Sequence, residues 1–131
     1  APVTGNKTFS PNNLHGNGSP TTMTITLTNP NVFLLTNAAL TDPLPAGLRV
    51  AATPTASTTC GGGTVTAVAG STSVSLSGGA IPASGSCTIT VRIEASSPNN
   101  AQDSNVTNSI PANNLTTTEG VTNASAIQGS V

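Results

Sequence analysis

The sequence predicts an all-β domain built from two antiparallel sheets. Apolar and small polar residues alternate with a period of two in several segments, which is typical of strands with one buried face. Clusters of Gly, Pro and Asn separate these segments, and no stretch keeps a helical period. About eight short strands at this spacing indicate a β-sandwich that is immunoglobulin-like in the broad sense, and 131 residues are enough for one domain, residues 1–131.

The individual strands follow from this alternation. In "TMTITLT", Met23, Ile25 and Leu27 share one face while threonines occupy the other, and "TITVRIE" repeats the pattern with its Ile and Val residues. Threonine favours strands and remains wettable, so the outer faces need little charge. In chain order, the expected strands are residues 7–10, 22–28, 32–42, 48–52, 63–69, 73–76, 88–94, 105–110 and 120–127.

The composition excludes several classes of partner. Charged residues make up 5% of the chain, against about 25% in typical globular domains, and the formal net charge is −1. Nucleic-acid binding requires a basic stripe and usually aromatic rings, whereas this chain has three basic residues, two Phe and no Trp or Tyr. The longest apolar run, residues 32–35, is too short to span a bilayer. We therefore expect neither nucleic-acid binding nor membrane insertion.

The two cysteines, Cys60 and Cys87, are expected to form a disulfide. They lack the CxxC spacing of a zinc site, and His15 is the only histidine, so a zinc ion would have too few ligands. The acidic residues form no calcium-loop pattern either, and neither a metal nor a cofactor is expected. A disulfide indicates an oxidising, extracytoplasmic compartment. Because the chain begins without Met or a signal peptide, we expect one repeat cut from a longer secreted or surface protein.

Three polar residues, each on a different expected strand, occupy positions whose side chains should point to the buried face. Lys7, the only lysine, is two residues from Phe9. Asp42 alternates with the leucines of "LTDPL", and Asn123 alternates with the apolar residues of "GVTNASAI". Burial would lower the pKa of the lysine and raise the pKa of the carboxyl, which favours the neutral form of each. Such groups are costly in a core unless they satisfy one another.

In a core without water, an amine can replace the ammonia of a carboxamide, and a carboxylic acid can carry the proton. Neutral Lys7 would attack the side-chain carbonyl of Asn123, Asp42 would polarise that carbonyl and shuttle the proton, and ammonia would leave. The product is an intramolecular isopeptide bond, formed once, so the chain is not expected to be an enzyme. Two alternatives remain open: Asn108 also lies on an apolar parity and is a second candidate acceptor, and Glu119 is a second candidate acid.

Longer segments carry a resemblance to a known class of domain. "SPTTMTITLTNPN", "ALTDPLPAGLRVA" and "GSCTITVRIEA" resemble the conserved-repeat domains of unknown function that occur in tandem in large bacterial cell-surface proteins. The order Lys, Asp, Asn resembles collagen-adhesin-type domains, in which an acid catalyses an isopeptide bond between Lys and Asn. This resemblance implies that Lys7 and Asn123 are joined and that Asp42 is the catalyst.

The resemblance implies a structural stalk repeat of an adhesin-like protein on the bacterial cell surface. Its partners would be neighbouring repeats of the same chain, while the host or surface ligand of the whole protein stays unknown. The runner-up is a ligand- or carbohydrate-binding module that uses the Asn- and Gly-rich loops, although exposed aromatic residues and convergent charges are scarce. An ice-binding surface is a minor alternative, since the pattern of "TTMTITLT" appears only once at length.

An enzyme class and a purely structural interpretation of the three polar residues are the remaining alternatives. A hydrolase is not expected, because a single histidine and scattered acids match no known catalytic motif. In the structural interpretation of the three polar residues, Lys7 lies at an edge with its ammonium group in water, Asp42 caps the "DPLP" turn, and Asn123 hydrogen-bonds the backbone. We expect the cross-link because the only lysine, the acid and the asparagine occur in the order that the resemblance to collagen-adhesin-type domains implies.

Overall fold

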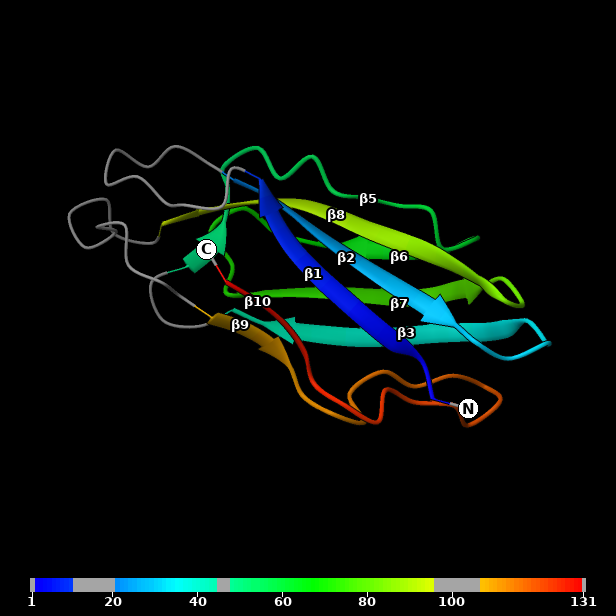
Figure 1. The fold of residues 1–131 in the computed structure, drawn as a ribbon. Coiled ribbons are helices and arrows are strands. Elements are labelled where there is room, and N and C mark those ends of the chain that lie inside the picture. The colour runs from blue at the N-terminus through cyan, green and yellow to red at the C-terminus, as the bar shows by residue number, and fades with distance from the viewer. Residues whose placement is uncertain (1, 11–20, 45–47, 96–106, 131) are drawn as a thin grey trace.

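A computed structural model describes residues 2–10, 21–44, 48–95 and 107–130. His15 therefore lies outside the described residues. Figure 1 shows an elongated molecule in which the start of β1 and the end of β10 lie at opposite ends. The strands are β1 (Thr4–Ser10), β2 (Thr21–Asn29), β3 (Leu35–Pro43), β4 (Leu48–Val50), β5 (Ser57–Thr58), β6 (Thr64–Thr66), β7 (Ser73–Ile81), β8 (Gly85–Ala95), β9 (Thr107–Ile110) and β10 (Ile127–Ser130).

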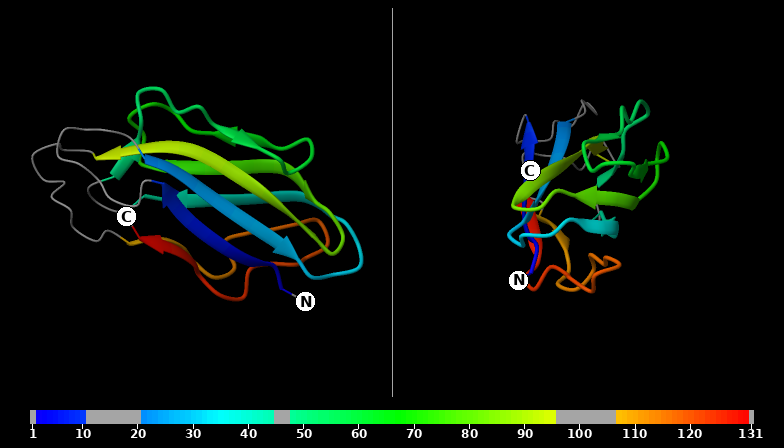
Figure 2. Two further views of the ribbon diagram at one scale, coloured as in Figure 1. Left: turned by 45° about the horizontal axis from the view of Figure 1, so that its top comes forward. Right: turned by 90° about the vertical axis from the view of Figure 1, so that its right-hand side faces the viewer.

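Two antiparallel sheets form the layers of a β-sandwich. The first has the strand order β1-β2-β8-β4, with the short β5 also paired to β8. The second has the order β3-β7-β6. Figure 2 shows these two layers stacked against each other. The predicted all-β sandwich is confirmed, and no helix long and apolar enough to cross a membrane occurs in the described ranges.

The core follows the period-two pattern of the sequence. Met23, Ile25 and Leu27 on β2 have no exposed surface, while the threonines between them are only partly covered. On the neighbouring β8, Ile25 pairs with Ile89 and Met23 with Val91, and these residues are buried as well. Each fully buried aliphatic side chain stabilises the fold by roughly 1.5–3 kcal/mol relative to an exposed one. The alternation therefore sets which face of each strand meets the core.

A separate two-stranded unit, β9–β10, closes one side of the sandwich. Its strands pair antiparallel, with Asn108 opposite Gly129. β10 lies along β1 and β9 contacts β3, and these two neighbours are the edge strands of the two layers (Figure 1). The unit therefore joins the edge of one sheet to the edge of the other, and residues of all three sheets meet at this side.

Several expected strand boundaries are wrong: β7 runs to Ile81 where residue 76 was expected, β6 ends at Thr66 where residue 69 was expected, and β5 was not expected. The last strand begins at Ile127, whereas residues 120–127 were expected to form it, and residues 120–126 are irregular. The strand expected from residue 32 begins at Leu35, because residues 29–34 form a turn in which Asn29 Nδ2 donates to the carbonyl of Phe33. Val32 is 88% exposed at this turn. Turn chemistry thus overrides the apolar run at residues 32–35 and the alternating pattern at residues 120–127.

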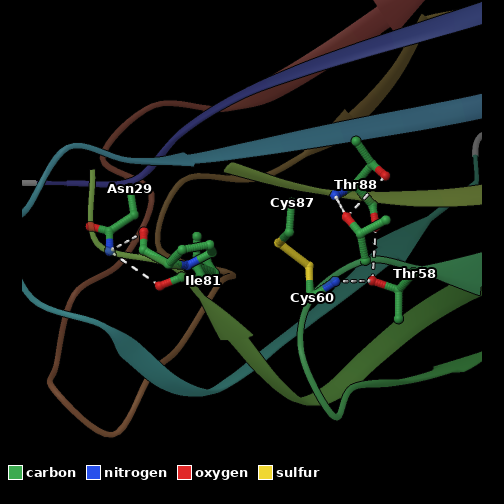
Figure 3. The surroundings of a disulfide bond; sticks show 8 residues. Asn29, Thr58, Cys60, Ile81, Cys87 and Thr88 are labelled. Carbon is green, nitrogen blue, oxygen red and sulfur yellow. Dashed lines mark hydrogen bonds between the residues drawn. A yellow bond between two sulfur atoms is a disulfide. The ribbon is translucent and has the colours of Figure 1, made fainter. Parts of the chain in front are cut away.

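The disulfide between Cys60 and Cys87 is confirmed, with a Cα–Cα distance of 5.0 Å (Figure 3). Cys87 lies on β8, and Cys60 lies in the segment that follows β5. The backbone N–H of Thr59 donates to a carbonyl of β8, whereas the N–H of Gly61 donates to a carbonyl of β7. The disulfide therefore holds the chain where it crosses between layers, and it indicates an oxidising compartment.

Candidate functional site

The side chain of Lys7 points into the core. Lys7 lies in the middle of β1, opposite Ile25 of β2, and its side chain has 0% exposure. Phe9, two residues further along, is also buried, as the shared parity predicts. A lysine in this position has lost the hydration of its ammonium group, which is costly unless a partner compensates for it.

The partner of Lys7 is Asp42, which comes from the opposite layer. Asp42 lies on β3, opposite Val74 of β7, and its side chain has 0% exposure. The distance from Lys7 Nζ to Asp42 Oδ2 is 2.8 Å. The two groups therefore form a direct contact across the sandwich, between residues that are far apart in the sequence.

Asn108 completes the site from the third sheet. It lies on β9 and is fully buried, and its Nδ2 donates to Asp42 Oδ2 at 3.1 Å. Lys7 Nζ contacts the same oxygen at 2.8 Å. The distance between Lys7 Nζ and Asn108 Nδ2 is therefore no more than the sum of 2.8 Å and 3.1 Å. β1, β3 and β9 thus bring an amine, a carboxyl and a carboxamide together in a buried site.

Two oxygens of this site make no hydrogen bond to any described residue. They are Asp42 Oδ1 and Asn108 Oδ1, and both are buried. An ionised carboxyl is only an acceptor, whereas a protonated carboxyl also offers one O–H donor. A carboxylic acid is therefore complementary to a carboxamide, because it accepts from the amide N–H with one oxygen and donates to the amide oxygen with the other.

Burial shifts both ionisable groups toward their neutral forms. Loss of water lowers the pKa of Lys7 below its usual value, and the charge and hydrogen bond of Asp42 oppose this shift only in part. Burial likewise raises the pKa of Asp42, with Lys7 and Asn108 acting in the opposite direction. The site therefore favours a neutral amine beside a protonated carboxyl.

The chain matches the family described as Domain of unknown function (DUF7933) over residues 3–130. It belongs to the DUF7933 family. No curated protein matches the chain. The family match covers all ten strands, so the site described above lies within the DUF7933 domain.

Asn123 occupies a different part of this DUF7933 domain from the one expected. It is buried but lies before β10, and its carboxamide binds the backbone of the segment that connects β9 to β10. Its Nδ2 donates to the carbonyls of Pro111 and Ser125 at 3.0 Å each, and its Oδ1 accepts from the N–H of Leu115 at 2.9 Å. In the described part of the chain it makes no hydrogen bond to Lys7 or Asp42. The expected place of Asn123 on the inner face of the last strand is therefore wrong, and Asn108 occupies the position beside the acid.

Glu119 lies outside the core of the DUF7933 domain. It is exposed, and its two carboxylate oxygens accept hydrogen bonds from the backbone N–H and the hydroxyl of Thr36, at 2.7 Å each. The hydrogen bond from the Thr36 backbone lowers the pKa of Glu119. Glu119 therefore lies away from Lys7, and the carboxyl group that contacts Lys7 is that of Asp42.

Met23 is a member of the site that the sequence does not single out. Asn108 Nδ2 lies 3.4 Å from Met23 Sδ, so the thioether contacts the carboxamide nitrogen that also donates to Asp42. The sequence shows Met23 only as an apolar residue on the inner face of its strand. Its contact with Asn108 depends on how β9 is placed against β2, and no local pattern reports that placement.

Proposed function

We propose that this DUF7933 domain is a structural repeat of an adhesin-like protein on the bacterial cell surface, cross-linked by an autocatalytic isopeptide bond between Lys7 and Asn108. The observation that carries the proposal is the shared contact at Asp42, whose Oδ2 accepts from both Lys7 Nζ and Asn108 Nδ2 in a fully buried site. The acceptor is Asn108, the alternative to Asn123, because the Asn123 carboxamide already binds three backbone groups.

The reaction uses only these three side chains. The lone pair of neutral Lys7 Nζ attacks Asn108 Cγ, and the carboxylic acid of Asp42 donates its proton to Asn108 Oδ1 as the carbonyl bond opens. The resulting Asp42 carboxylate takes a proton from the attacking nitrogen and delivers it to Asn108 Nδ2. The Cγ–Nδ2 bond then breaks, ammonia leaves, and the proton on Oδ1 returns to Asp42.

The fold supplies the rate by holding the reacting groups together. Intramolecular placement of this kind corresponds to effective concentrations of about 10⁵ M or more. The burial that favours the neutral amine also excludes water, which would otherwise solvate the amine and slow its attack. One molecule of ammonia per chain is the only by-product, so no turnover follows.

The cross-link would give the domain mechanical strength. It would close a loop of 101 positions (108 − 7) and stabilise the fold by about 4.7 kcal/mol, by analogy with long disulfide loops. Force applied at the two ends of the molecule would pass from β1 directly to β9. The hydrogen-bonded sheets between these residues would carry no load, which suits a stalk that links neighbouring repeats.

The proposal is tested by the intact mass of the purified protein after reduction and denaturation. We expect the wild-type chain to be lighter than its sequence by one ammonia, and the Lys7→Ala, Asp42→Ala and Asn108→Ala variants to have their full masses. Asn123→Ala serves as the matched control and should still lose ammonia. Asn108→Asp should lose water instead, and its final mass should equal that of the wild type because both form the same amide.

Each alternative gives a different result in this experiment. An unshifted wild-type mass would contradict the cross-link. If Asn108→Ala still loses ammonia and Asn123→Ala does not, the acceptor is Asn123. Peptide mapping of the wild type then identifies the joined residues directly.

A ligand-binding module is the second candidate function. It is favoured by the exposed apolar side chains at the turn between β2 and β3, where Phe33 is 46% and Leu34 is 49% exposed beside Val32. Three adjacent exposed apolar residues offer a contact surface for a carbohydrate or another surface molecule. An unshifted wild-type mass would favour this candidate over the cross-linked repeat.

A further inference from the structure

We infer that Gly129 is a positioning residue for the Lys7–Asn108 cross-link, because its missing side chain lets β10 lie directly against Lys7. The inference rests on the proposed function and extends it to a residue that takes no part in the bond. Gly129 is the direct cross-strand partner of Asn108 in the β9–β10 unit. The same residue therefore faces both ends of the proposed bond.

A side chain at Gly129 would meet the backbone of Lys7. A Cβ atom there would lie 2.5 Å from the Lys7 carbonyl oxygen, 2.9 Å from Lys7 Cγ and 3.0 Å from the Lys7 carbonyl carbon. Two of these atoms belong to the backbone of β1 and cannot turn aside as a flexible side chain can. A methyl group at position 129 would have to push β10 away from β1.

Backbone conformation does not explain this glycine. Positive φ angles occur at Gly62, Gly70, Gly78 and Gly120 among the described glycines, and Gly129 is not one of them. An L-residue could adopt the backbone conformation of position 129, so the requirement at this position is for space. The space is taken up by Lys7, whose aliphatic stem passes the glycine on its way to Asp42.

Displacement of β10 would move the acceptor as well. Asn108 is held opposite Gly129 by the pairing of β9 with β10, so a shift of β10 away from β1 carries Asn108 away from the Lys7 amine. Misplacement of reacting groups by about 1 Å can cost on the order of 10²-fold in rate. Gly129 therefore sets the distance across which the bond forms.

The test compares two glycines that lie in the same contact between β1 and β10. The three atoms nearest to a Cβ at Gly5 all belong to the side chain of Ile127, so Gly5→Ala adds the same methyl group to this contact, and Gly5 does not pair with Asn108. Each chain is made by chemical synthesis, so that it has never folded, is kept in denaturant, where the unfolded chain cannot react, and is then folded by dilution. Intact mass at successive times gives the rate of ammonia loss.

We expect Gly129→Ala to lose ammonia about 100-fold more slowly than the wild type, and Gly5→Ala to react at nearly the wild-type rate. The same two substitutions in the Lys7→Ala background give their effects on folding alone, measured by urea unfolding. An unchanged rate in Gly129→Ala would overturn the inference. An equal slowing in Gly5→Ala would also overturn it, because the effect would then be one of general packing. Failure of Gly129→Ala to fold in the Lys7→Ala background would overturn it for the same reason. A wild type that never loses ammonia would instead overturn the proposed function.

Discussion

Lys7 and Asp42 are expensive residues to bury as ions. Taking two charges out of water costs several kcal/mol for each ion, and their mutual attraction compensates for this only when their other hydrogen bonds are satisfied. Here Asp42 Oδ1 has no partner among the described residues. Burial therefore favours the neutral forms of both groups, and conversion of the amine into an amide would leave no basic group in the core that could take up a charge.

The rate of the reaction is expected to depend on pH in a bell-shaped manner. The reactive form has a neutral Lys7 and a protonated Asp42. Burial lowers the pKa of Lys7, so the rate should fall only when the pH drops below this lowered value and the amine takes up a proton. Burial raises the pKa of Asp42, so the rate should also fall when the pH rises above that value and the acid loses its proton. Ammonia loss from the chemically synthesised chain, followed by mass after dilution from denaturant at each pH, measures both limbs.

The Asp42→Asn variant is the control for this profile. An asparagine at position 42 keeps the shape of the side chain but cannot transfer a proton, so we expect a much slower reaction without the high-pH limb. A wild-type rate that rises steadily with pH would contradict the role of Asp42 and would leave deprotonation of Lys7 as the only controlling step.

For single residues, the sequence predicts the direction in which a side chain points better than it predicts the residues that the side chain contacts. The inward positions of Lys7 and Asp42 follow from their alternation with apolar neighbours, because side chains of a strand point to opposite faces in turn. The choice between Asn108 and Asn123 does not follow, since both alternate with apolar residues. It depends on which asparagine finds backbone partners nearby, and that is a property of the folded chain.

Among the elements, the connection between β9 and β10 differs most from its expected form. Alternation suggested a strand over residues 120–127, but the polar and small residues of "VTNASA" also suit a turn. Asn123 decides between the two, because its carboxamide satisfies three backbone groups that a strand would have to pair elsewhere. Residues 22–28 and 88–94 alternate without interruption, and the structure places them within β2 and β8 as expected.

Asn123 is therefore expected to matter for stability and not for the reaction. Asn123→Ala in the Lys7→Ala background should lower the free energy of unfolding by about 3 kcal/mol, because it leaves buried backbone groups without partners. Urea unfolding measures this loss. Asn114→Ala is the matched control: the Asn114 carboxamide accepts one hydrogen bond from the N–H of Thr41 at an exposed position, and its loss should cost about 1 kcal/mol or less. Equal losses in both variants would contradict the structural role of Asn123.

In the whole molecule, the disulfide and the proposed isopeptide bond hold different parts of the fold together. The disulfide closes 27 positions between Cys60 and Cys87 and fixes the crossing from one layer to the other, far along the chain from Lys7 and Asn108. Replacing both cysteines by alanine in the Lys7→Ala background should lower the free energy of unfolding by roughly 3–4 kcal/mol, as seen by urea unfolding. In the otherwise wild-type chain the same double substitution should leave ammonia loss unchanged. Loss of the reaction there would show that the two bonds depend on each other.

The position of Asn108 near the end of the chain has one more consequence. With the proposed bond in place, residues 7–108 form a closed ring, and the smaller ring of the disulfide lies inside it. A protease that cuts once anywhere between Lys7 and Asn108 would open the ring without releasing a fragment. A surface protein surrounded by hydrolases would keep its outer domains attached after such a cut, although one of its repeats had been nicked.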